Sequence, residues 1–490
     1  MSHSISQQVF ETRLAHHFGM TPTAGQERLF HVFSRFAFSE KPRCALLVKG
    51  YAGTGKTSSV KAMVNALEES GMGVMLLAPT GRAAKVLSAY TSRPAFTIHK
   101  QIYIRKMDRS GRMWFDLLEC QLKNTVFFVD EASMIGNELQ DTGDSLEGSE
   151  LLEDLLSHIF SGENCRVVLI GDSAQLPPVG CAESPALDVD LLRDRYDLNI
   201  AGVELTEVMR QKEDSWILEN ATRIRNAIAK GVAQTPELLV SAKGEVRAVT
   251  GDIQPYVEDA LRDYGIDDMI ILTRSNKRAN LFNQQMRVRI LGHEEEINAG
   301  DRMMVVKNNY FWLEEAAQGE ATQGEAAFIA NGDIIEILRI RSYIERGPFR
   351  FCKAVIRMSD YKSIPEMEVI LWCDAIYAET ANLGFQKMKA LYDEIAPDYE
   401  DIDNPMKRRK AIRQDPFYNA LQVKFAYAVT VHKAQGGQWP CVFVDRGYVT
   451  DEMLGTEYNR WLYTAITRAQ HQLLLVGFAP EMLIDADRSG

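Results

Sequence analysis

Short, uninterrupted runs of apolar residues recur along the chain, and each ends in small or polar residues. The first set reads CALLVKG (44–50), GVMLLAPT (73–80), TVFFVDEAS (125–133) and RVVLIGD (166–172). A second set reads MIILTRS (269–275), FAYAVTVHKAQG (425–436), CVFVDRG (441–447) and QLLLVGF (472–478). Such runs are typical of parallel strands that are buried on both faces, with helices between them. The pattern predicts two doubly wound α/β cores.

A different pattern interrupts the second core. Residues 300–375 alternate apolar and polar positions between turn residues, which predicts a small antiparallel barrel, and residues 376–420 look mostly helical. We therefore expect four parts, which are a short N-terminal helical segment (1–20), a first core (21–200), a second core in two pieces (201–299 and 421–490), and an insertion between those pieces (300–420).

Composition narrows the class of protein. The chain has 490 residues, of which 46% are hydrophobic, so large cores can be buried. No apolar run reaches the roughly 18 residues of a membrane helix, and the start MSHSISQQ lacks the features of a signal peptide. The seven cysteines are scattered without a C-x-x-C pair, which indicates neither a disulfide framework nor a zinc site. We expect no membrane partner and a reducing, cytoplasmic location.

The net charge of −12 argues only mildly against a nucleic-acid partner. Much of the acidic excess lies in two loop-like stretches, 136–150 and 314–327, whose roles the sequence does not indicate. A basic run, Lys407 to Lys410, stands apart from them. It is either a solvated helix face or a phosphate contact.

The stretch GYAGTGKT (50–57) fits the pattern G-x-x-x-x-G-K-[ST] and follows a predicted strand. Glycines let backbone N–H groups approach a phosphate, so Gly53, Thr54 and Gly55 are expected to cradle it. Lys56 is expected to meet the outer phosphates, and the Thr57 hydroxyl can ligate Mg²⁺. The loop predicts a bound nucleoside triphosphate but not its use.

Two acidic residues end the strand in TVFFVDEAS. Asp130 can hold Mg²⁺ and Glu131 can orient an attacking water, which together indicate hydrolysis. Because the carboxyl ends of parallel strands meet at one edge of a sheet, the pair and the P-loop should lie together.

Three further side chains suit the same chemistry. Gln175, in GDSAQLPPVG, is a neutral group able to sense the γ-phosphate or position water. Arg210, in LTEVMRQ, and Arg468, in YTAITRAQ, are candidates for arginine fingers that reach across a cleft from the second core.

The order of these pieces identifies a family. GYAGTGKT, APTGRAA, VDEAS, GDSAQLPPVG, LTEVMRQ, TVHKAQGGQ and YTAITRA resemble, in sequence order, the motifs of superfamily one helicases of the RecD-like branch. The resemblance implies two RecA-like cores, an ATP- and Mg²⁺-dependent DNA helicase, and catalytic roles for Lys56, Glu131, Gln175, Arg210 and Arg468.

The resemblance also implies further contacts. Gln26, in TPTAGQERLF, is similar to a glutamine that reads adenine, although Thr23 and Gln26 also satisfy a helix capping box. Segments that touch single-stranded DNA in this family match Thr80, His99, Thr430 and His432 in this chain. These side chains are donors suited to a phosphate backbone.

Two insertions resemble DNA-handling elements of the family. QIYIRKMDRSGRMWFDL (101–117) has two strand-like arms and resembles the β-hairpin, at about 100–118, that splits the duplex, with Trp114 as a candidate DNA contact. It is otherwise a hairpin packed by its own aromatics. GDRMMVVKNNYFW with FIANGD resembles an inserted SH3-like barrel.

From the family we expect a stand-alone, monomeric helicase that moves 5′ to 3′ on single-stranded DNA and acts at duplex junctions. The first alternative is a DNA-stimulated ATPase subunit of a repair or recombination complex that translocates without unwinding. The second is a P-loop kinase for a small molecule, which has no use for arginines in a second core.

Overall fold

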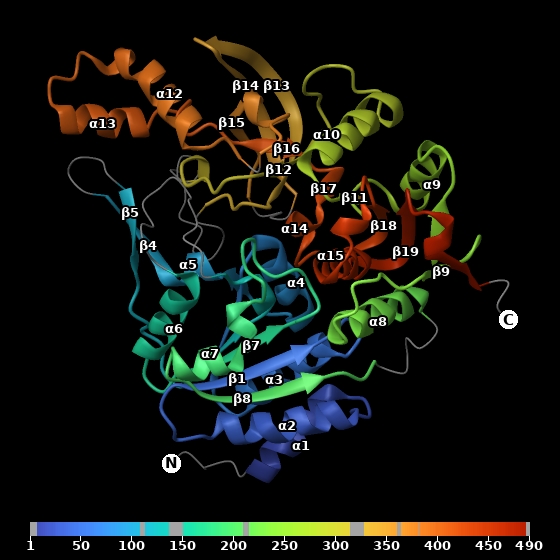
Figure 1. The fold of residues 1–490 in the computed structure, drawn as a ribbon. Coiled ribbons are helices and arrows are strands. Elements are labelled where there is room, and N and C mark those ends of the chain that lie inside the picture. Colours follow the sequence, from blue (N-terminus) through green and yellow to red (C-terminus); the bar gives the residue numbers. More distant parts are fainter. Residues whose placement is uncertain are drawn as a thin grey trace.

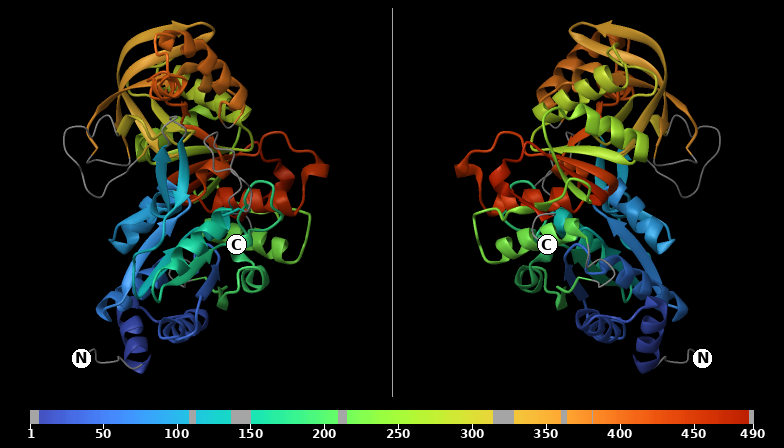
Figure 2. Two further views of the ribbon diagram at one scale, coloured as in Figure 1. Left: turned by 90° about the vertical axis from the view of Figure 1, so that its left-hand side faces the viewer. Right: turned by 90° about the vertical axis from the view of Figure 1, so that its right-hand side faces the viewer.

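The computed structural model of the chain describes residues 7–107, 113–136, 150–208, 215–313, 328–359, 364–380 and 382–486. Its strands form two parallel sheets, one antiparallel sheet and two smaller pairs (Figure 1). The first parallel sheet lies at one end of the molecule and the antiparallel sheet at the other (Figure 2). Within this described part, no helix has the length and apolar character to span a membrane.

The first sheet has the order β3-β2-β6-β7-β1-β8, and all its strands are parallel. Its strands are β1 (Cys44–Gly50), β2 (Gly73–Ala78), β3 (Ala95–Thr97), β6 (Thr125–Val129), β7 (Arg166–Gly171) and β8 (Asn199–Leu205). Its helices are α1 (Gln7–Phe18), α2 (Ala24–Ala37), α3 (Lys56–Glu69), α4 (Gly81–Thr91), α5 (Ile98–Ile102), α6 (Leu151–Ser161) and α7 (Val189–Asp194).

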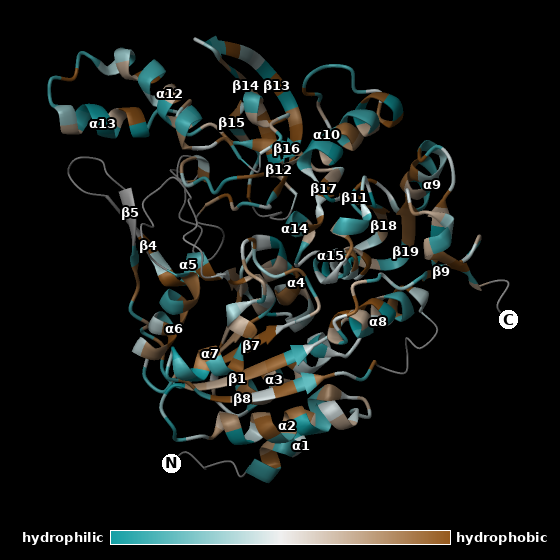
Figure 3. Cartoon of the chain, viewed as in Figure 1, coloured by the Kyte–Doolittle hydropathy of each residue, from teal (hydrophilic) through white to brown (hydrophobic). Residues whose placement is uncertain are grey.

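Both faces of this sheet are buried. Leu46 and Val48 of β1 pack in a cluster with α1, α2 and α3, whereas Ala45 and Leu47 pack in a second cluster with α5, α6 and α7. Strands β1 and β7 accordingly carry hydrophobic residues along their length, whereas the projecting helices α12 (Phe385–Ile395) and α13 (Pro405–Arg413) are mainly hydrophilic (Figure 3). Two-sided burial explains why the sequence shows continuous apolar runs here.

The second sheet is also parallel, with the order β10-β19-β18-β11-β17. Its strands are β10 (Val246–Val249), β11 (Met269–Thr273), β17 (Ala428–Thr430), β18 (Trp439–Asp445) and β19 (Ala469–Val476). Around it lie α8 (Trp216–Ala229), α9 (Gln254–Tyr264), α10 (Asn276–Gln285) with a π-helical extension (Met286–Ile290), α14 (Val431–Ala434) and α15 (Thr456–Ile466). A short parallel pair, β9 (Leu238–Val240) with β20 (Leu483–Asp485), completes this part.

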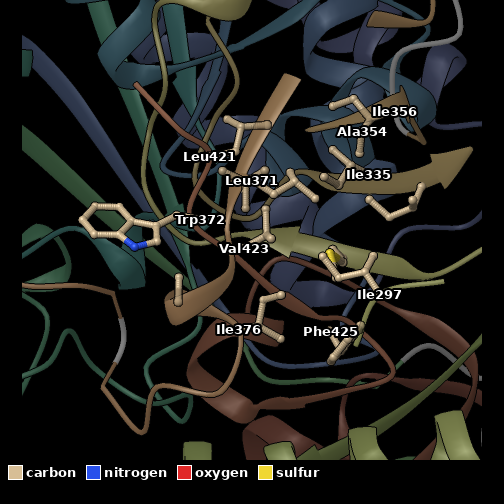
Figure 4. Close-up of a cluster of buried hydrophobic side chains, with 14 of the residues drawn as sticks. Ile297, Ile335, Ala354, Ile356, Leu371, Trp372, Ile376, Leu421, Val423 and Phe425 are labelled. Carbon is tan, nitrogen blue, oxygen red and sulfur yellow. The ribbon is translucent and has the colours of Figure 1, made fainter. Parts of the chain in front are cut away.

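The third sheet is antiparallel, with the order β15-β14-β13-β12-β16. Its strands are β12 (Arg302–Val305), β13 (Ile334–Arg346), β14 (Phe349–Met358), β15 (Met367–Trp372) and β16 (Val423–Phe425). Leu421 donates to the Ile370 carbonyl at 2.7 Å and accepts from the Trp372 N–H at 2.9 Å, so the chain entering β16 lies beside β15. Figure 4 shows Leu371, Leu421 and Val423 close together in the core that this sheet encloses.

Two paired strands lie at the place of the predicted hairpin. Strands β4 (Tyr103–Met107) and β5 (Met113–Leu117) are antiparallel and pair with each other. They lie on the same side of the molecule as α12 and α13 (Figure 1). Residues 108–112 between the strands lie outside the described residues.

The sequence predicted the α/β class and the parallel sheets correctly. The strand registers add detail at the expected boundaries between parts. Strand β8 pairs with β1 along its whole length, so the first sheet continues past residue 200. Strand β16 pairs with β12, so the antiparallel sheet continues past residue 420.

Candidate functional site

Three neighbouring strands of the first sheet deliver polar groups to the same edge. Strand β1 leads into the loop at 51–55, β6 is followed by Asp130 and Glu131, and β7 is followed by Asp172. We call these groups, with Lys56, Thr57 and Gln175, the P-loop edge. The sheet order β6-β7-β1 brings them together, as the sequence predicted from the parallel topology.

The loop at 51–55 has the backbone geometry of a phosphate cradle. Gly53 and Gly55 both have a φ of +78°, which only glycine adopts at low cost. A Cβ added to Gly53 would lie 3.1 Å from the Leu218 side chain, so a larger residue would crowd the loop. Gly55 is the N-cap of α3 and supplies no side-chain bond, which leaves the first N–H groups of the helix available to an anion. The residues present therefore fit a bound nucleotide.

Lys56 begins α3 and turns back over the loop. Its amine donates to the carbonyls of Gly50 and Tyr51 and lies 3.9 Å from Oδ2 of Asp172. Thr57 is exposed in the first turn of the helix. The amine thus lies within the P-loop edge, where a phosphate would approach.

The two carboxylates after β6 are only partly exposed. Asp130 accepts hydrogen bonds from the Tyr90 hydroxyl at 2.8 Å and from the Glu131 N–H at 2.9 Å. Glu131 has a φ of +51°, an unusual value for this residue type that is typical of functional sites. Burial raises the pKa of both carboxyls, and the positive charge of Arg468 opposes this shift at Glu131. A cation bound here would offset the cost of burying them.

Gln175 is buried, and its Oε1 atom has no hydrogen-bond partner within the described part of the chain. Its N–H donates to the Asp172 carbonyl at 3.3 Å. A buried amide oxygen without a partner is costly, so this atom is available to a ligand or a water. Its predicted contact with the γ-phosphate stays a prediction.

Arg468 follows α15 of the second sheet and is buried. Its guanidinium donates to the Thr464 and Gly437 carbonyls at 3.0 and 3.1 Å and to the Thr467 hydroxyl at 3.1 Å. Its charge partly offsets the rise that burial causes in the pKa of Glu131, so it acts on the P-loop edge from the opposite sheet. Arg210, the other predicted finger, lies outside the described residues.

Gln26 forms the capping box that was one of its two predicted roles. Its Oε1 atom accepts from the Thr23 N–H at 2.9 Å, and Thr23 caps α2 in return. Its Nε2 atom donates to the Thr54 carbonyl at 3.1 Å, and the side chain has no exposed surface. Gln26 therefore ties α2 to the P-loop, and its predicted adenine contact stays a prediction.

A cavity of about 420 Å³ lies where the first, second and antiparallel sheets meet, and we call it the interface cavity. Thr80 and His99 line it from the first sheet, and His432 lines it from the second. Thr80 is also the N-cap of α4, and its hydroxyl accepts from the Ala83 N–H at 3.2 Å. Three of the five predicted DNA contacts thus lie around one space.

The other two predicted contacts fall differently. Thr430 is the N-cap of α14, beside His432 in sequence but not among the residues that line the interface cavity. Trp114 belongs to β5, and its side chain lies outside the described part.

The insertion forms one wall of the interface cavity, and the sequence had not predicted which of its residues would do so. Tyr310 and Phe328 line the interface cavity with ring centroids 4.8 Å apart. Lys307 and Lys433 also line it, and burial lowers the pKa of Lys433 to about 8. Aromatic rings beside cations are the combination that binds single-stranded nucleic acid. The segments VKNNYFW and FIANGD carried the signal, since both matched the insertion expected over DNA.

A hydrogen bond connects the lining of the interface cavity to the chain beside the P-loop edge. Gln435 lines the cavity, and its Nε2 atom donates at 2.9 Å to the carbonyl of Leu176, the residue after Gln175. The Leu176 N–H in turn donates to the Thr464 hydroxyl of α15 at 2.8 Å. A change in the distance between the sheets therefore alters both sites together.

Family models match one range that contains the first parallel sheet and another that contains part of the second. A model described as an AAA domain matches residues 34–249, and one described as a UvrD-like helicase C-terminal domain matches residues 425–476. The ATP-dependent DNA helicase dda of Enterobacteria phage T4 is 29% identical over 481 residues, which cover 93% of this chain and 96% of that protein. The ATP-dependent RecD2 DNA helicase of Deinococcus radiodurans is 32% identical over 36% of this chain and 21% of its own length.

The chain is similar to an ATP-dependent DNA helicase along most of its length, and its motifs resemble those of the superfamily one helicases of the RecD-like branch. The crystal structure of Bacteroides Pif1 bound to ssDNA aligns over 96% of both chains, with 16% identity and a TM-score of 0.47.

Two tyrosines at the P-loop edge were not predicted from the sequence. Tyr90 bonds the carboxylate of Asp130, and Tyr463 bonds Ala52 of the P-loop and Asp172. Both lie on helices, α4 and α15, and an aromatic residue in such a helix is normally interpreted as part of the hydrophobic core. Only the YTAITRA motif around Tyr463 marked one of them.

The pKa of His99 tests whether this side chain of the interface cavity is buried away from water. Burial lowers its pKa to about 4, so the unfolded chain, with a histidine pKa of about 6.5, binds this proton more readily than the folded one. The contribution to stability is present above pH 6.5 and is lost as the pH falls toward 4. Between pH 7 and pH 5, the parent should lose about 2 kcal/mol more unfolding free energy than His99→Gln, measured by urea denaturation. The exposed His471→Gln serves as the control, and equal losses in parent and His99→Gln would contradict the assignment.

Proposed function

We propose that this chain is an ATP- and Mg²⁺-dependent DNA helicase that moves along single-stranded DNA and opens duplexes at junctions. The observation that carries the proposal is the bond from Gln435 to Leu176, which joins a cavity lined by DNA-type contacts to the wall of a P-loop site. A small-molecule kinase needs an acceptor pocket at the P-loop and no such connection.

The roles at the P-loop edge follow from the residue chemistry. Lys56 and the N-terminus of α3 hold the phosphates, and Gly53, Thr54 and Gly55 form the cradle. Thr57 and Asp130 are the protein ligands for the metal. Bound ATP and Mg²⁺ would supply the phosphoanhydride bond to be broken and the neutralisation of its charge.

Hydrolysis then depends on groups from both sheets. Glu131 orients the attacking water and takes its proton on a carboxylate oxygen, while Gln175 contacts the γ-phosphate through its amide. Arg468 neutralises charge from the second sheet, and Arg210 has the same proposed role. Because these groups must approach one another, turnover requires the cores to close.

DNA is proposed to run through the interface cavity. Thr80, His99 and His432 contact the phosphate backbone, and Thr430 and Trp114 are proposed contacts further along the strand. Tyr310 and Phe328 offer rings on which bases can stack. Closing and opening of the cores would move the strand in steps, and by family resemblance the direction is 5′ to 3′.

The strand registers support a division into parts close to the expected one. We propose a helical segment up to residue 20, a first RecA-like core of 21–205, a second of 206–299 and 426–490, and an insertion of 300–425. The insertion is proposed to be an SH3-like barrel with a helical extension, supported by the hydrogen bonds between Leu421 and β15. The protein is proposed to act as a monomer in the cytoplasm.

The ATPase roles predict different defects for Lys56→Ala and Glu131→Gln. Both should lower DNA-stimulated turnover by at least about 10²-fold, since each removes a group needed for bond cleavage. Only Lys56→Ala should lose ATP affinity, because Lys56 contacts ground-state phosphates and Glu131 acts on water. Equilibrium binding of a fluorescent ATP analogue and steady-state hydrolysis measure the two effects. The exposed Glu452→Gln is the control, and equal loss of affinity in both variants would reject these roles.

The direction of movement is tested with duplexes that carry only a 5′ or only a 3′ single-stranded tail. We expect ATP-dependent unwinding of the 5′-tailed duplex and little of the 3′-tailed one. Vigorous DNA-stimulated ATP hydrolysis without unwinding of either substrate would instead identify a translocase. Unwinding of the 3′-tailed duplex alone would overturn the proposed direction.

The hairpin of β4 and β5 is proposed to be the wedge that separates the strands. Replacing residues 104–114 with an Asn-Gly turn should lower the unwinding rate of a 5′-tailed duplex at least tenfold. It should leave ATP hydrolysis on single-stranded DNA within about twofold, because the P-loop edge is untouched. Holding open one base-pair step needs about 1.4 kcal/mol, which stacking of about 1–3 kcal/mol per base on an aromatic residue can offset.

Displacement of a protein block from single-stranded DNA is the companion measurement for the hairpin variant. Translocation should persist there. If the shortened variant unwinds as fast as the parent, the hairpin is structural and strand separation takes place elsewhere.

A further inference from the structure

Helix α15, which packs on the second sheet, bonds to the segment that follows β7 at the P-loop edge. Besides accepting the Leu176 N–H, it sends Arg460 to the Ser173 carbonyl at 3.0 Å. The helix faces the first sheet across the region where the two sheets meet (Figure 1). Its side chains therefore bond repeatedly to residues 172–176, which follow β7.

Tyr463 makes the most central of these contacts. Its side chain is 1% exposed, and its hydroxyl accepts the Ala52 N–H of the P-loop at 3.0 Å. The same hydroxyl donates to Oδ2 of Asp172 at 2.7 Å. Burial and the charge of Asp172 raise the pKa of Tyr463 well above its usual value, so the hydroxyl keeps the proton that it donates.

One hydroxyl thus joins two segments of the first sheet to a helix of the second. Both segments flank Lys56, whose amine lies 3.9 Å from the same Asp172 oxygen. Hydrogen bonds weaken steeply beyond about 3.5 Å, so a shift of α15 by roughly 1 Å breaks both bonds. The two bonds form together only when the sheets are at the separation seen here.

The hydroxyl of Tyr463 is not needed for packing, because the ring of a phenylalanine would fill the same space. Tyr463 belongs to the second sheet's core cluster, and Phe has the same ring and nearly the same volume. What the hydroxyl adds is a pair of polar bonds across the interface. Loss of such a bond to a charged, buried partner is expensive, whereas loss of ring packing does not occur.

We propose that Tyr463 is a positioning residue. It holds the P-loop and Asp172 at the position relative to the second core that ATP hydrolysis requires. The role rests on the proposed function, since it matters only if core closure drives hydrolysis. Tyr463 touches no reacting atom. Closure of the two cores brings Arg468 toward Glu131. Through Tyr463, the same closure fixes the conformation of the loop that holds the phosphates.

The test is Tyr463→Phe in the full-length chain. We expect kcat for ATP hydrolysis on single-stranded DNA to fall about 10- to 100-fold, since a bond to a buried charge is lost. The affinity for ATP without DNA should stay within about threefold, because Lys56 and the α3 N-terminus are unchanged. The affinity for single-stranded DNA should also be unchanged. A residue that only supports the fold would not separate kcat from ATP affinity in this way.

Tyr458→Phe is the matched control. Tyr458 is a buried tyrosine of the same helix, and its hydroxyl neighbours Arg446 within the second core. Its removal should leave kcat within about twofold. A thermal melt of each variant shows whether the fold has been kept.

Asp172→Asn and the double variant with Tyr463→Phe complete the experiment. If the two residues act through their shared bond, the double variant should be no slower than the slower single variant. Additive losses, a parent-like kcat in Tyr463→Phe, or equal losses of kcat and ATP affinity would each overturn the role. The parent is measured first, because a parent without DNA-stimulated hydrolysis refutes the proposed function and this role with it. An active parent with an unaffected Tyr463→Phe refutes only the role of Tyr463.

Discussion

The buried carboxylate of Asp172 is the constraint around which the rest of the site is arranged. It is 1% exposed and must be satisfied by donors, because an unpaired buried charge is costly. Ala174 supplies an N–H from its own loop, and Tyr463 supplies a hydroxyl from the second core. Neither core can therefore move away without depriving this charge of a donor. The requirement links the two parallel sheets at the point where the nucleotide is proposed to bind.

The same arrangement shows why a DNA cavity and a nucleotide site can influence each other. The segment from Asp172 to Leu176 is short, and its two ends face different partners. One end bonds Tyr463 beside the P-loop, and the other bonds Gln435 at the wall of the interface cavity. Gly436 supports this close approach, since a Cβ there would lie 2.7 Å from Ala83 of the first core. Coupling therefore passes through direct contacts rather than across a long path.

Much of this architecture could be predicted from the sequence, because it depends on local patterns. Two-sided burial produces continuous apolar runs, so the hydrophobic pattern alone locates β1, β6, β7, β11 and β18. Backbone requirements of the phosphate loop leave glycines at fixed spacing, which marked Gly53 and Gly55. Gln26 showed the limit, since the same spacing predicted either a helix cap or an adenine contact, and the structure shows the cap.

Other features depend on tertiary contacts that leave no local pattern. The pairing of β8 with β1 was missed, because a strand at a sheet edge alternates in burial and resembles its neighbours in sequence. In the sequence, Tyr463 and Tyr90 look like aromatic residues of the core. Their hydroxyls bond carboxylates that are far away in sequence, so only the structure shows this role. Tyr310 and Phe328 lie on either side of a segment outside the described residues, and their ring contact is invisible in the linear order.

The bonds from Lys56 to the carbonyls of Gly50 and Tyr51 make nucleotide binding an exchange of partners. A phosphate that reaches the amine must displace these carbonyls, so the net gain in free energy is the difference between two good interactions. The affinity for the phosphate is therefore lower than its interaction with Lys56 alone would give. For a protein that must discharge its product before each new cycle, restrained affinity keeps the turnover from stalling at release.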